Sequence, residues 1–146
     1  MESSKIIVYT DGGSRGNPGP AGVGVFVVGE KGQILSKYSK FLGTRTNNEA
    51  EYDAVIFALQ KSKARFGKEK IKEISTEFRM DSQLVVRQLS GKYKIEAPAL
   101  FPLFIKIWNL KMEFGPISFV EIPREQNEEA DKLANEAMDG EKSNAA

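Results

Sequence analysis

The sequence predicts an α/β domain in which a mixed five-stranded sheet carries packed helices. Two observations predict this class. Three strand-like stretches follow one another with only turns between them, and helical patterns then alternate with two further strands. With 146 residues, 40% of them hydrophobic, the chain suits one domain with a real core. We expect this domain to occupy residues 1–139, with a polar tail over residues 140–146.

The first three strands are expected over residues 5–9, 21–28 and 34–41. The second strand reads AGVGVFVV, which places Ala and Val side chains on one face and Gly22 and Gly24 on the other. Two glycines on one face predict close packing against a neighbouring element. The sequence EKGQ, between the second and third strands, is typical of a hairpin turn.

The remaining elements are helices over 48–66, 81–91 and 127–138, a helix that opens at Pro98, and strands over 72–80 and 117–122. Proline is favoured at the first helical position, and Gly91 is typical of a helix stop. Helical spacing places three sets of residues each on one side of a helix, and we expect the first and third sets to be buried. They comprise Leu84, Val85, Gln88 and Leu89; then Leu100, Phe104, Ile107 and Lys111; and finally Ala130, Leu133, Ala134 and Ala137.

Charge and residue types narrow the chemistry. The 21 Lys and Arg residues against 20 Asp and Glu give a net charge of +1, so no global basic field indicates a nucleic-acid partner. The chain has no cysteine and no histidine. This composition excludes disulfides, thiolate or imidazole metal sites, and histidine as a general base. Carboxylates remain for chemistry, and they suit hard ions such as Mg²⁺.

Glu51 stands near the start of the long predicted helix, in the sequence NNEAEYDAVIFAL. Val55 and Leu59 share its helical face, which leans toward the core. A carboxylate beside a core is costly unless something pairs with it. The alternative is a surface acid stabilised by the helix dipole. The apolar residues on the same helical face favour instead a position beside the core, where Glu51 needs a group of opposite charge.

Three further acids raise the same question. Asp11 ends the first predicted strand in YTDGGSRGNPGPAG, where a glycine-rich turn is the alternative; a P-loop fails because no Lys-Ser/Thr follows the glycines. Asp81 follows the fourth strand and would also serve as a helix N-cap. Asp131 lies on the shoulder of the last buried stripe, where a solvated charged face is the alternative.

The four acids are weak signals singly and a stronger signal together. Two of them end strands that would lie side by side, and two come from helix faces that lean toward the sheet. Converging carboxylates repel one another unless cations join them. Two divalent ions about 3.5–4 Å apart are a known arrangement for phosphodiester chemistry. We therefore expect the partner of Glu51 to be a metal ion.

The chain resembles ribonuclease H, type 1, over nearly its whole length. The resemblance is carried, in order, by YTDGGSRGNPGPAG, TNNEAEY, DSQLVVRQLSG and NEEADKLANEA. It implies a ribonuclease H-like fold with sheet order 3-2-1-4-5 and helices on both faces. The implied activity is endonucleolytic hydrolysis of the RNA strand of RNA–DNA hybrids, which leaves 5′-phosphate and 3′-hydroxyl ends.

The same resemblance implies the site residues. The catalytic and metal-binding acids would be Asp11, Glu51, Asp81 and Asp131, holding two Mg²⁺ ions, for which Mn²⁺ would substitute. Asp11 would bridge both ions, Glu51 and Asp81 would hold the ion at the attacking water, and Asp131 the ion at the leaving 3′-oxygen. Substrate binding would use Gly12, Gly13, Ser14, Asn17, Thr46, Asn47, Asn48, Gln83, Lys92 and Arg124. Amide side chains suit a minor groove that displays 2′-hydroxyls.

Two departures from the family pattern stand out. Many members carry a histidine before the last acid, but this loop reads IPREQNEEAD, as in the histidine-poor form found in archaeal and some bacterial members. We expect Arg124 to be at most an electrostatic aid there. The link YKIEAPA leaves no place for the extra helix of members with a basic protrusion, nor is there room for an N-terminal hybrid-binding domain.

Three alternatives stay open: a binding module without catalysis, a metal nuclease acting on another duplex, and a ribonuclease H domain of a reverse transcriptase. The acids argue against the first, and the start at Met1 favours a free-standing enzyme over the last. No signal peptide or membrane-spanning run is apparent. We expect a cytoplasmic monomer with no membrane or protein partner.

Overall fold

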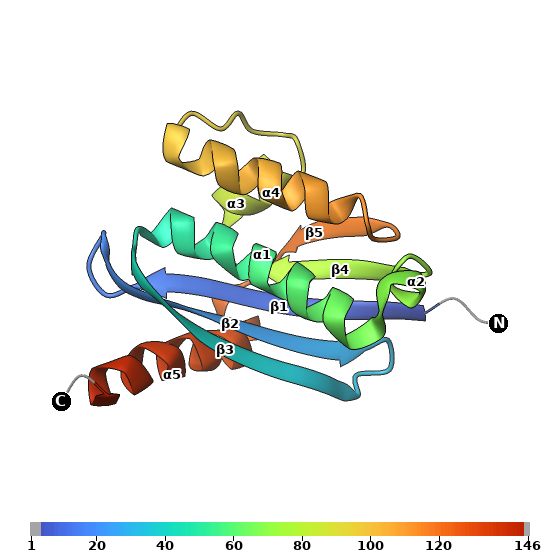
Figure 1. Ribbon diagram of the computed structural model, residues 1–146, viewed down its shortest axis with the longest axis horizontal. Coiled ribbons are helices and arrows are strands. Elements are labelled where there is room, and N and C mark those ends of the chain that lie inside the picture. Colours follow the sequence, from blue (N-terminus) through green and yellow to red (C-terminus); the bar gives the residue numbers. More distant parts are fainter. Residues whose placement is uncertain (1–3, 145–146) are drawn as a thin grey trace.

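The computed structural model describes residues 4–144 and contains one five-stranded sheet (Figure 1). The strands are β1 (Ser4–Ser14), β2 (Gly19–Gly29), β3 (Ile34–Arg45), β4 (Ile74–Met80) and β5 (Ile117–Glu121). The helices are α1 (Asn47–Phe66), α2 (Lys68–Ile71), α3 (Gln83–Leu89), α4 (Phe101–Lys111) and α5 (Glu128–Asn144). Short 3₁₀ turns, Pro98–Leu100 and Arg124–Gln126, precede α4 and α5.

The sheet has the order β3-β2-β1-β4-β5, as expected. β2 pairs antiparallel with both β1 and β3, because hairpin turns connect these strands. β1 pairs parallel with β4, and β4 with β5, because long connections that contain helices return the chain to the same end of the sheet. The mixed α/β class is therefore confirmed.

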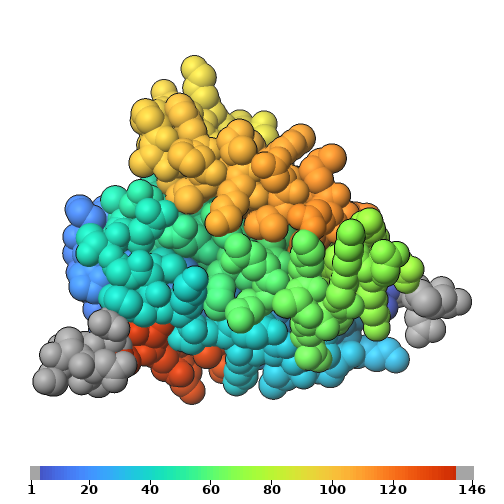
Figure 2. Space-filling view, viewed as in Figure 1, coloured from blue at the N-terminus to red at the C-terminus, as the bar shows by residue number. Residues whose placement is uncertain are grey.

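Helices cover both faces of this sheet. α1 packs over β1 with α4 beside it, and α5 packs against β2 and β3 (Figure 1). The space-filling view shows α1, α2 and α4 covering the near face (Figure 2). The core between α1 and the sheet buries Tyr52, Leu59 and Phe78 completely. Within the described residues, no helix is both long and apolar enough to cross a membrane.

The glycine face of β2 is where α5 comes closest to the sheet. A Cβ atom on Gly24 would collide with the carbonyl oxygen of Ala130, and one on Gly22 would lie 2.8 Å from that of Ala134. The predicted close packing is confirmed, and its partner is the last helix. Because Gly24 pairs with Asp11 in the sheet, this contact brings α5 beside Asp11.

Several boundaries differ from the predicted ones. β1 does not end at Tyr9 but continues to Ser14, because β2 keeps pairing with it beyond the end of β4. In α3, the buried side chains centre on Val85 and Leu89, so Leu84, predicted to face inward, is 40% exposed. α5 runs to Asn144 rather than Met138, so most of the predicted tail is helical, and residues 145–146 lie outside the described part.

Candidate active site

The site lies where the parallel pairing of β1 and β4 stops. That pairing ends at Tyr9 and Arg79, while β1 continues alongside β2 alone. Asp11 therefore lies within β1 rather than at its end, just beyond the last parallel pair. Asp81 follows the last residue of β4. The two aspartates were predicted to neighbour each other, and the strand pairing explains why they do.

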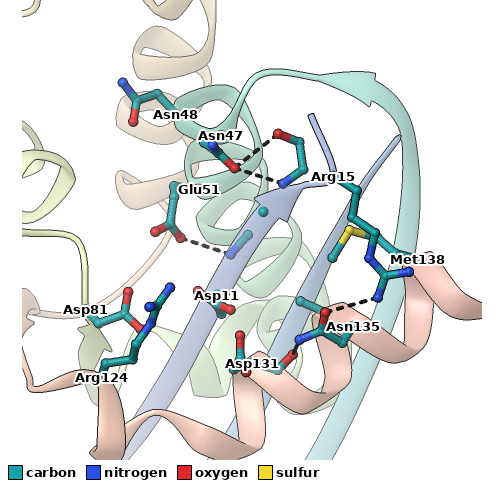
Figure 3. Close-up of a pocket in the computed structure, with 14 residues that line it drawn as sticks. Asp11, Arg15, Asn47, Asn48, Glu51, Asp81, Arg124, Asp131, Asn135 and Met138 are labelled. Carbon is teal, nitrogen blue, oxygen red and sulfur yellow. Dashed lines mark hydrogen bonds between the residues drawn. The ribbon is translucent and has the colours of Figure 1, made fainter. Parts of the chain in front are cut away.

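Glu51 enters from α1 and is held in place by the main chain of β1. Its Oε1 atom accepts a hydrogen bond of 2.9 Å from the amide of Gly12 (Figure 3). The side chain is only 9% exposed. A Cβ atom on Gly12 would collide with the carbonyl of Ala50, so only glycine allows α1 this close to β1. The core-facing position predicted for Glu51 is confirmed.

Three carboxylates converge at this point. Asp11, Glu51 and Asp81 each offer an oxygen, and these oxygens lie within 4.8 Å of one another. Asp131, in the first turn of α5, points toward Asp11 from the other side of the site (Figure 3). Asp131 is exposed, whereas Glu51 is nearly buried. The four predicted acids thus face one place, with three of them in the tight cluster.

Burial and mutual repulsion shift the pKa values of this cluster. Burial, the charges of Glu51 and Asp81, and the nearby Asp131 carboxyl together raise the pKa of Asp11 to about 9, with burial the largest cause. Burial also raises the pKa of Glu51 to about 8, opposed by the Gly12 amide and the Arg124 guanidinium. The fold therefore places Asp11 and Glu51 where, without a bound cation, the protonated form of each is favoured over the charged form.

The donor set fits a divalent ion that prefers oxygen. The cluster contains only carboxylate oxygens, and the chain has no histidine or cysteine to attract zinc. A bound cation would offset the burial and the repulsion that raise both pKa values, because it favours the charged carboxylates. The residues present therefore suit Mg²⁺ or Mn²⁺.

An open pocket of about 340 Å³ surrounds the cluster. Its lining includes all four acids and six of the residues expected to bind substrate: Gly12, Gly13, Ser14, Asn47, Asn48 and Arg124. Four expected residues are absent from the lining: Asn17, Thr46, Gln83 and Lys92. Gln83 and Lys92 are exposed at the start of α3 and in the loop that follows it.

Asn17 and Thr46 instead build the start of α1. The Thr46 hydroxyl accepts from the Glu49 amide at 3.2 Å, and the Glu49 carboxylate accepts from the Thr46 amide at 2.9 Å, which forms a capping box. Asn17 Oδ1 accepts from the Asn47 amide at 2.9 Å. Asn47 Oδ1 in turn accepts from the Ser14 amide at 2.9 Å. These bonds fix the turn after β1 to the helix that carries Glu51.

Five residues at the site were not predicted to belong to it: Arg15, Asn127, Ala134, Asn135 and Met138. Arg15 donates to Asn135 Oδ1 at 3.2 Å and pairs with Asp139 at 2.7 Å, which ties the turn after β1 to α5. Asn127 donates from Nδ2 to the Thr10 carbonyl oxygen at 2.9 Å and to Asp81 Oδ2 at 3.3 Å. Helical spacing from Asp131 could have indicated Asn127 and Asn135, which lie four residues to either side of it.

Comparison with known proteins identifies a consistent group of relatives. A family model described as reverse transcriptase-like matches residues 9–137. Ribonuclease HI of Halobacterium salinarum is 44% identical over 135 residues, which cover 92% of this chain and 65% of that protein. The bifunctional protein Rv2228c of Mycobacterium tuberculosis is 38% identical over 97% of this chain. The chain spans only 38% of the length of that relative.

Solved structures agree with these sequence relatives. LC11-RNase H1, isolated from compost by a metagenomic approach, is 51% identical with a TM-score of 0.87, and the match covers 93% of this chain and 96% of the other. LC11-RNase H1 in complex with RNA/DNA hybrid gives a TM-score of 0.88 at 51% identity, covering 92% and 97%. The foamy-virus RNase H domain, at 23% identity and a TM-score of 0.70, supports the fold alone.

Proposed function

This chain belongs to the ribonuclease H family, and from this premise we propose that it is a metal-dependent endonuclease that hydrolyses the RNA strand of RNA–DNA hybrids. The products would carry 5′-phosphate and 3′-hydroxyl ends. The observation that carries the proposal is the convergence of Asp11, Glu51 and Asp81 within 4.8 Å, from three separate elements. A relative 51% identical to this chain has been crystallised with RNA/DNA hybrid, which supports the substrate class.

The four acids would hold two Mg²⁺ ions, with Mn²⁺ as a substitute. Asp11 is central in the cluster and would be shared, with Glu51 and Asp81 on one side and Asp131 on the other (Figure 3). When bound, such ions supply Lewis-acid activation of the phosphodiester and of the attacking water. The protein would contribute rigid placement, since the Gly12 amide holds Glu51 and α5 holds Asp131.

Substrate recognition would use the amide-rich rim at the start of α1. Asn47 and Asn48 line the pocket beside the acids. Asn47 Oδ1 accepts from Ser14, which fixes the side chain and leaves its nitrogen to donate. A donor fixed at this rim suits the 2′-hydroxyls of a hybrid minor groove, which DNA duplexes lack. Gly12, Gly13 and Ser14 would meet the same strand through backbone groups.

One assay tests the proposal against its alternatives. Labelled hybrid, RNA duplex and DNA duplex are each incubated with Mg²⁺, Mn²⁺ or EDTA, with Asp81→Asn as the inactive control. We expect cleavage of the RNA strand in the hybrid alone, and only with metal. Cleavage of RNA duplex would indicate a different nuclease. Binding of hybrid without cleavage by wild-type protein would indicate a binding module and contradict the proposal.

A further inference from the structure

Asn127 lies just before α5 and touches the segments that carry three of the four acids. It is only 1% exposed. Its Nδ2 atom donates to the Thr10 carbonyl oxygen at 2.9 Å, next to Asp11, and to Asp81 Oδ2 at 3.3 Å. Its own carbonyl oxygen accepts from the Asp131 amide at 3.1 Å. One buried residue thus connects β1, the end of β4 and the first turn of α5.

The ordinary role of asparagine at this position would be to cap the helix. An N-cap side chain accepts a hydrogen bond through its oxygen from an amide in the first turn, and its backbone is extended. Asn127 Oδ1 is buried and has no hydrogen-bond partner among the described residues. The backbone of Asn127, with φ −115° and ψ 25°, is not extended. The side chain therefore does not cap α5.

Only the nitrogen of the Asn127 side chain forms hydrogen bonds within the described residues. Its nitrogen donates to two acceptors, whereas its oxygen is buried and unpaired among the described residues. A buried oxygen without a donor lowers stability. A side chain retained only for stability would be expected to satisfy both ends. The contribution of the side chain is therefore its Nδ2 donor, and one of the two acceptors of this donor is the Asp81 carboxylate of the cluster.

Asp81 needs such a donor. Its carboxylate is only partly buried, at the end of β4, and it faces Asp11 and Glu51, whose carboxylates repel it whenever they are charged. Without a hydrogen bond, side-chain rotation would carry this carboxylate out toward solvent. A donor from Asn127 opposes that rotation, since hydrogen bonds to charged acceptors are stronger than neutral ones.

We propose that Asn127 is a positioning residue that holds the Asp81 carboxylate toward Asp11 and Glu51, through its Nδ2 bridge between Asp81 and the Thr10 carbonyl. The inference rests on the proposed function, in which these carboxylates hold divalent ions. Asn127 does not reach the reacting atoms itself. It acts by keeping a ligand oriented, and partners of metal ligands typically change metal affinity or activity by about 10- to 100-fold when they are removed.

Two variants and a matched control test this role. Asn127→Asp keeps the shape of the side chain but replaces the donor with an acceptor, and Asn127→Ala removes the amide altogether. Gln88→Ala is the control, because Gln88 is another buried amide, 6% exposed, that accepts from the Tyr52 hydroxyl at 2.7 Å and does not line the pocket of the acids. Circular dichroism in EDTA establishes that each variant is folded.

The first readout needs neither substrate nor catalysis. The Mg²⁺ concentration that gives half of the maximal rise in Tm is measured without nucleic acid, with Asp11→Asn as the reference for a lost site. We expect Asn127→Asp and Asn127→Ala to require about 10- to 100-fold more Mg²⁺ than wild type. Gln88→Ala should lower Tm in EDTA yet respond to Mg²⁺ as wild type does.

The second readout is kinetic, on hybrid at fixed Mg²⁺. The Asn127 variants should lose kcat by about 10-fold or more, with KM for hybrid unchanged. Wild-type protein that fails to cleave hybrid would refute the proposed function, while the Mg²⁺ titration would still decide the role of Asn127. A wild-type Mg²⁺ response in either Asn127 variant, an equal loss in Gln88→Ala, or failure of both Asn127 variants to fold would overturn the proposal.

Discussion

Asp11 and Glu51 are carboxyl groups that the fold buries beside each other. Their pKa values rise from 3.8 and 4.5 to about 9 and about 8. At pH values between the unfolded and the folded pKa of each group, the folded protein binds more protons than the unfolded chain. Stability contributed by these protons is full below the unfolded pKa values and is lost as pH rises through the folded ones. The metal-free site should therefore weaken the fold at neutral and alkaline pH.

Asp11→Asn should remove this dependence from one group. In EDTA, we expect the free energy of unfolding of the variant to gain on that of wild type as pH rises from about 5 to 8, by at most about 1.4 kcal/mol per pH unit for one proton. Urea unfolding of both proteins across that range measures the difference. A difference that stays constant or reverses would show that Asp11 does not hold a proton in the folded protein.

Arg124 is the cation closest in role to the histidine that many relatives carry. Its guanidinium lines the pocket and opposes part of the rise that burial causes in the pKa of Glu51, but it stays charged and cannot donate a proton. General acid–base groups contribute about 100- to 10,000-fold. We expect Arg124→Ala to lose less than about 100-fold in kcat on hybrid with Mg²⁺.

Arg124→Lys tests whether a positive charge suffices at this position, because lysine keeps the charge without the guanidinium group. It should retain more activity than Arg124→Ala. Abolished activity in Arg124→Ala, with the Mg²⁺-induced rise in Tm intact, would give the arginine an essential role that this reasoning denies.

At the scale of elements, the close approach of α5 to β2 places the fourth acid. Gly24 pairs with Asp11 and lies against Ala130 of α5. A Cβ atom there would also lie 2.7 Å from the Leu133 Cβ, so Gly24→Ala must push the helix outward. Because Asp131 belongs to the first turn of the same helix, this displacement would move it away from Asp11.

We therefore expect Gly24→Ala to cost about 1–3 kcal/mol of unfolding free energy, as overpacking does, and to lower kcat on hybrid. Gly140→Ala is the control, since the same helix leaves open space at Gly140. Its effect should be neutral, or stabilising by about 0.5–1 kcal/mol. Urea unfolding and the hybrid assay measure both. A Gly24→Ala protein as stable as wild type would mean that α5 does not pack here as described.

The elements differ in how well sequence periodicity predicts them. Periodicity was enough to predict the core-facing position of Glu51 and the close packing at the glycine face of β2. The spacing of residues along a helix or strand shows which side chains share its buried face. It failed for the end of β1, where pairing with β2 extends the strand past its apolar run. It also failed for the contacts of Asn127 and Arg15, which join residues 46 to 124 positions apart, although helical spacing from Asp131 could have indicated the position of Asn127. Such contacts leave no local pattern.

Across the whole molecule, the fold brings four acids to a single place: one each from β1, α1 and α5, and Asp81 from the residue that follows β4. α1 reaches it from one face and α5 from the other, while β1 and the end of β4 provide the floor (Figure 1, Figure 3). The site is thus acidic, within a protein whose net charge is only +1. Attraction of a polyanion must then rest on the metal ions and on few local contacts.

The cations around the pocket are few and partly neutralised. Arg15 and Arg124 are the two basic residues in its lining, and Arg15 already pairs with Asp139 at 2.7 Å. Each phosphate neutralised by a protein cation adds about 0.9 to the slope of log affinity against log salt. A few such contacts predict a slope no steeper than about −3 for hybrid binding.

Asp81→Asn, which should bind without cleaving, allows this slope to be measured by titrating KCl at fixed Mg²⁺. A slope near −10, as for a large repressor, would mean an extended basic interface that this surface does not offer. Lys92→Ala in the same background tests whether Lys92, outside the pocket lining, meets a DNA-strand phosphate. If it does, the slope should become shallower by about 0.9, whereas Lys31→Ala, near the β2–β3 turn and lining a different pocket, should leave it unchanged.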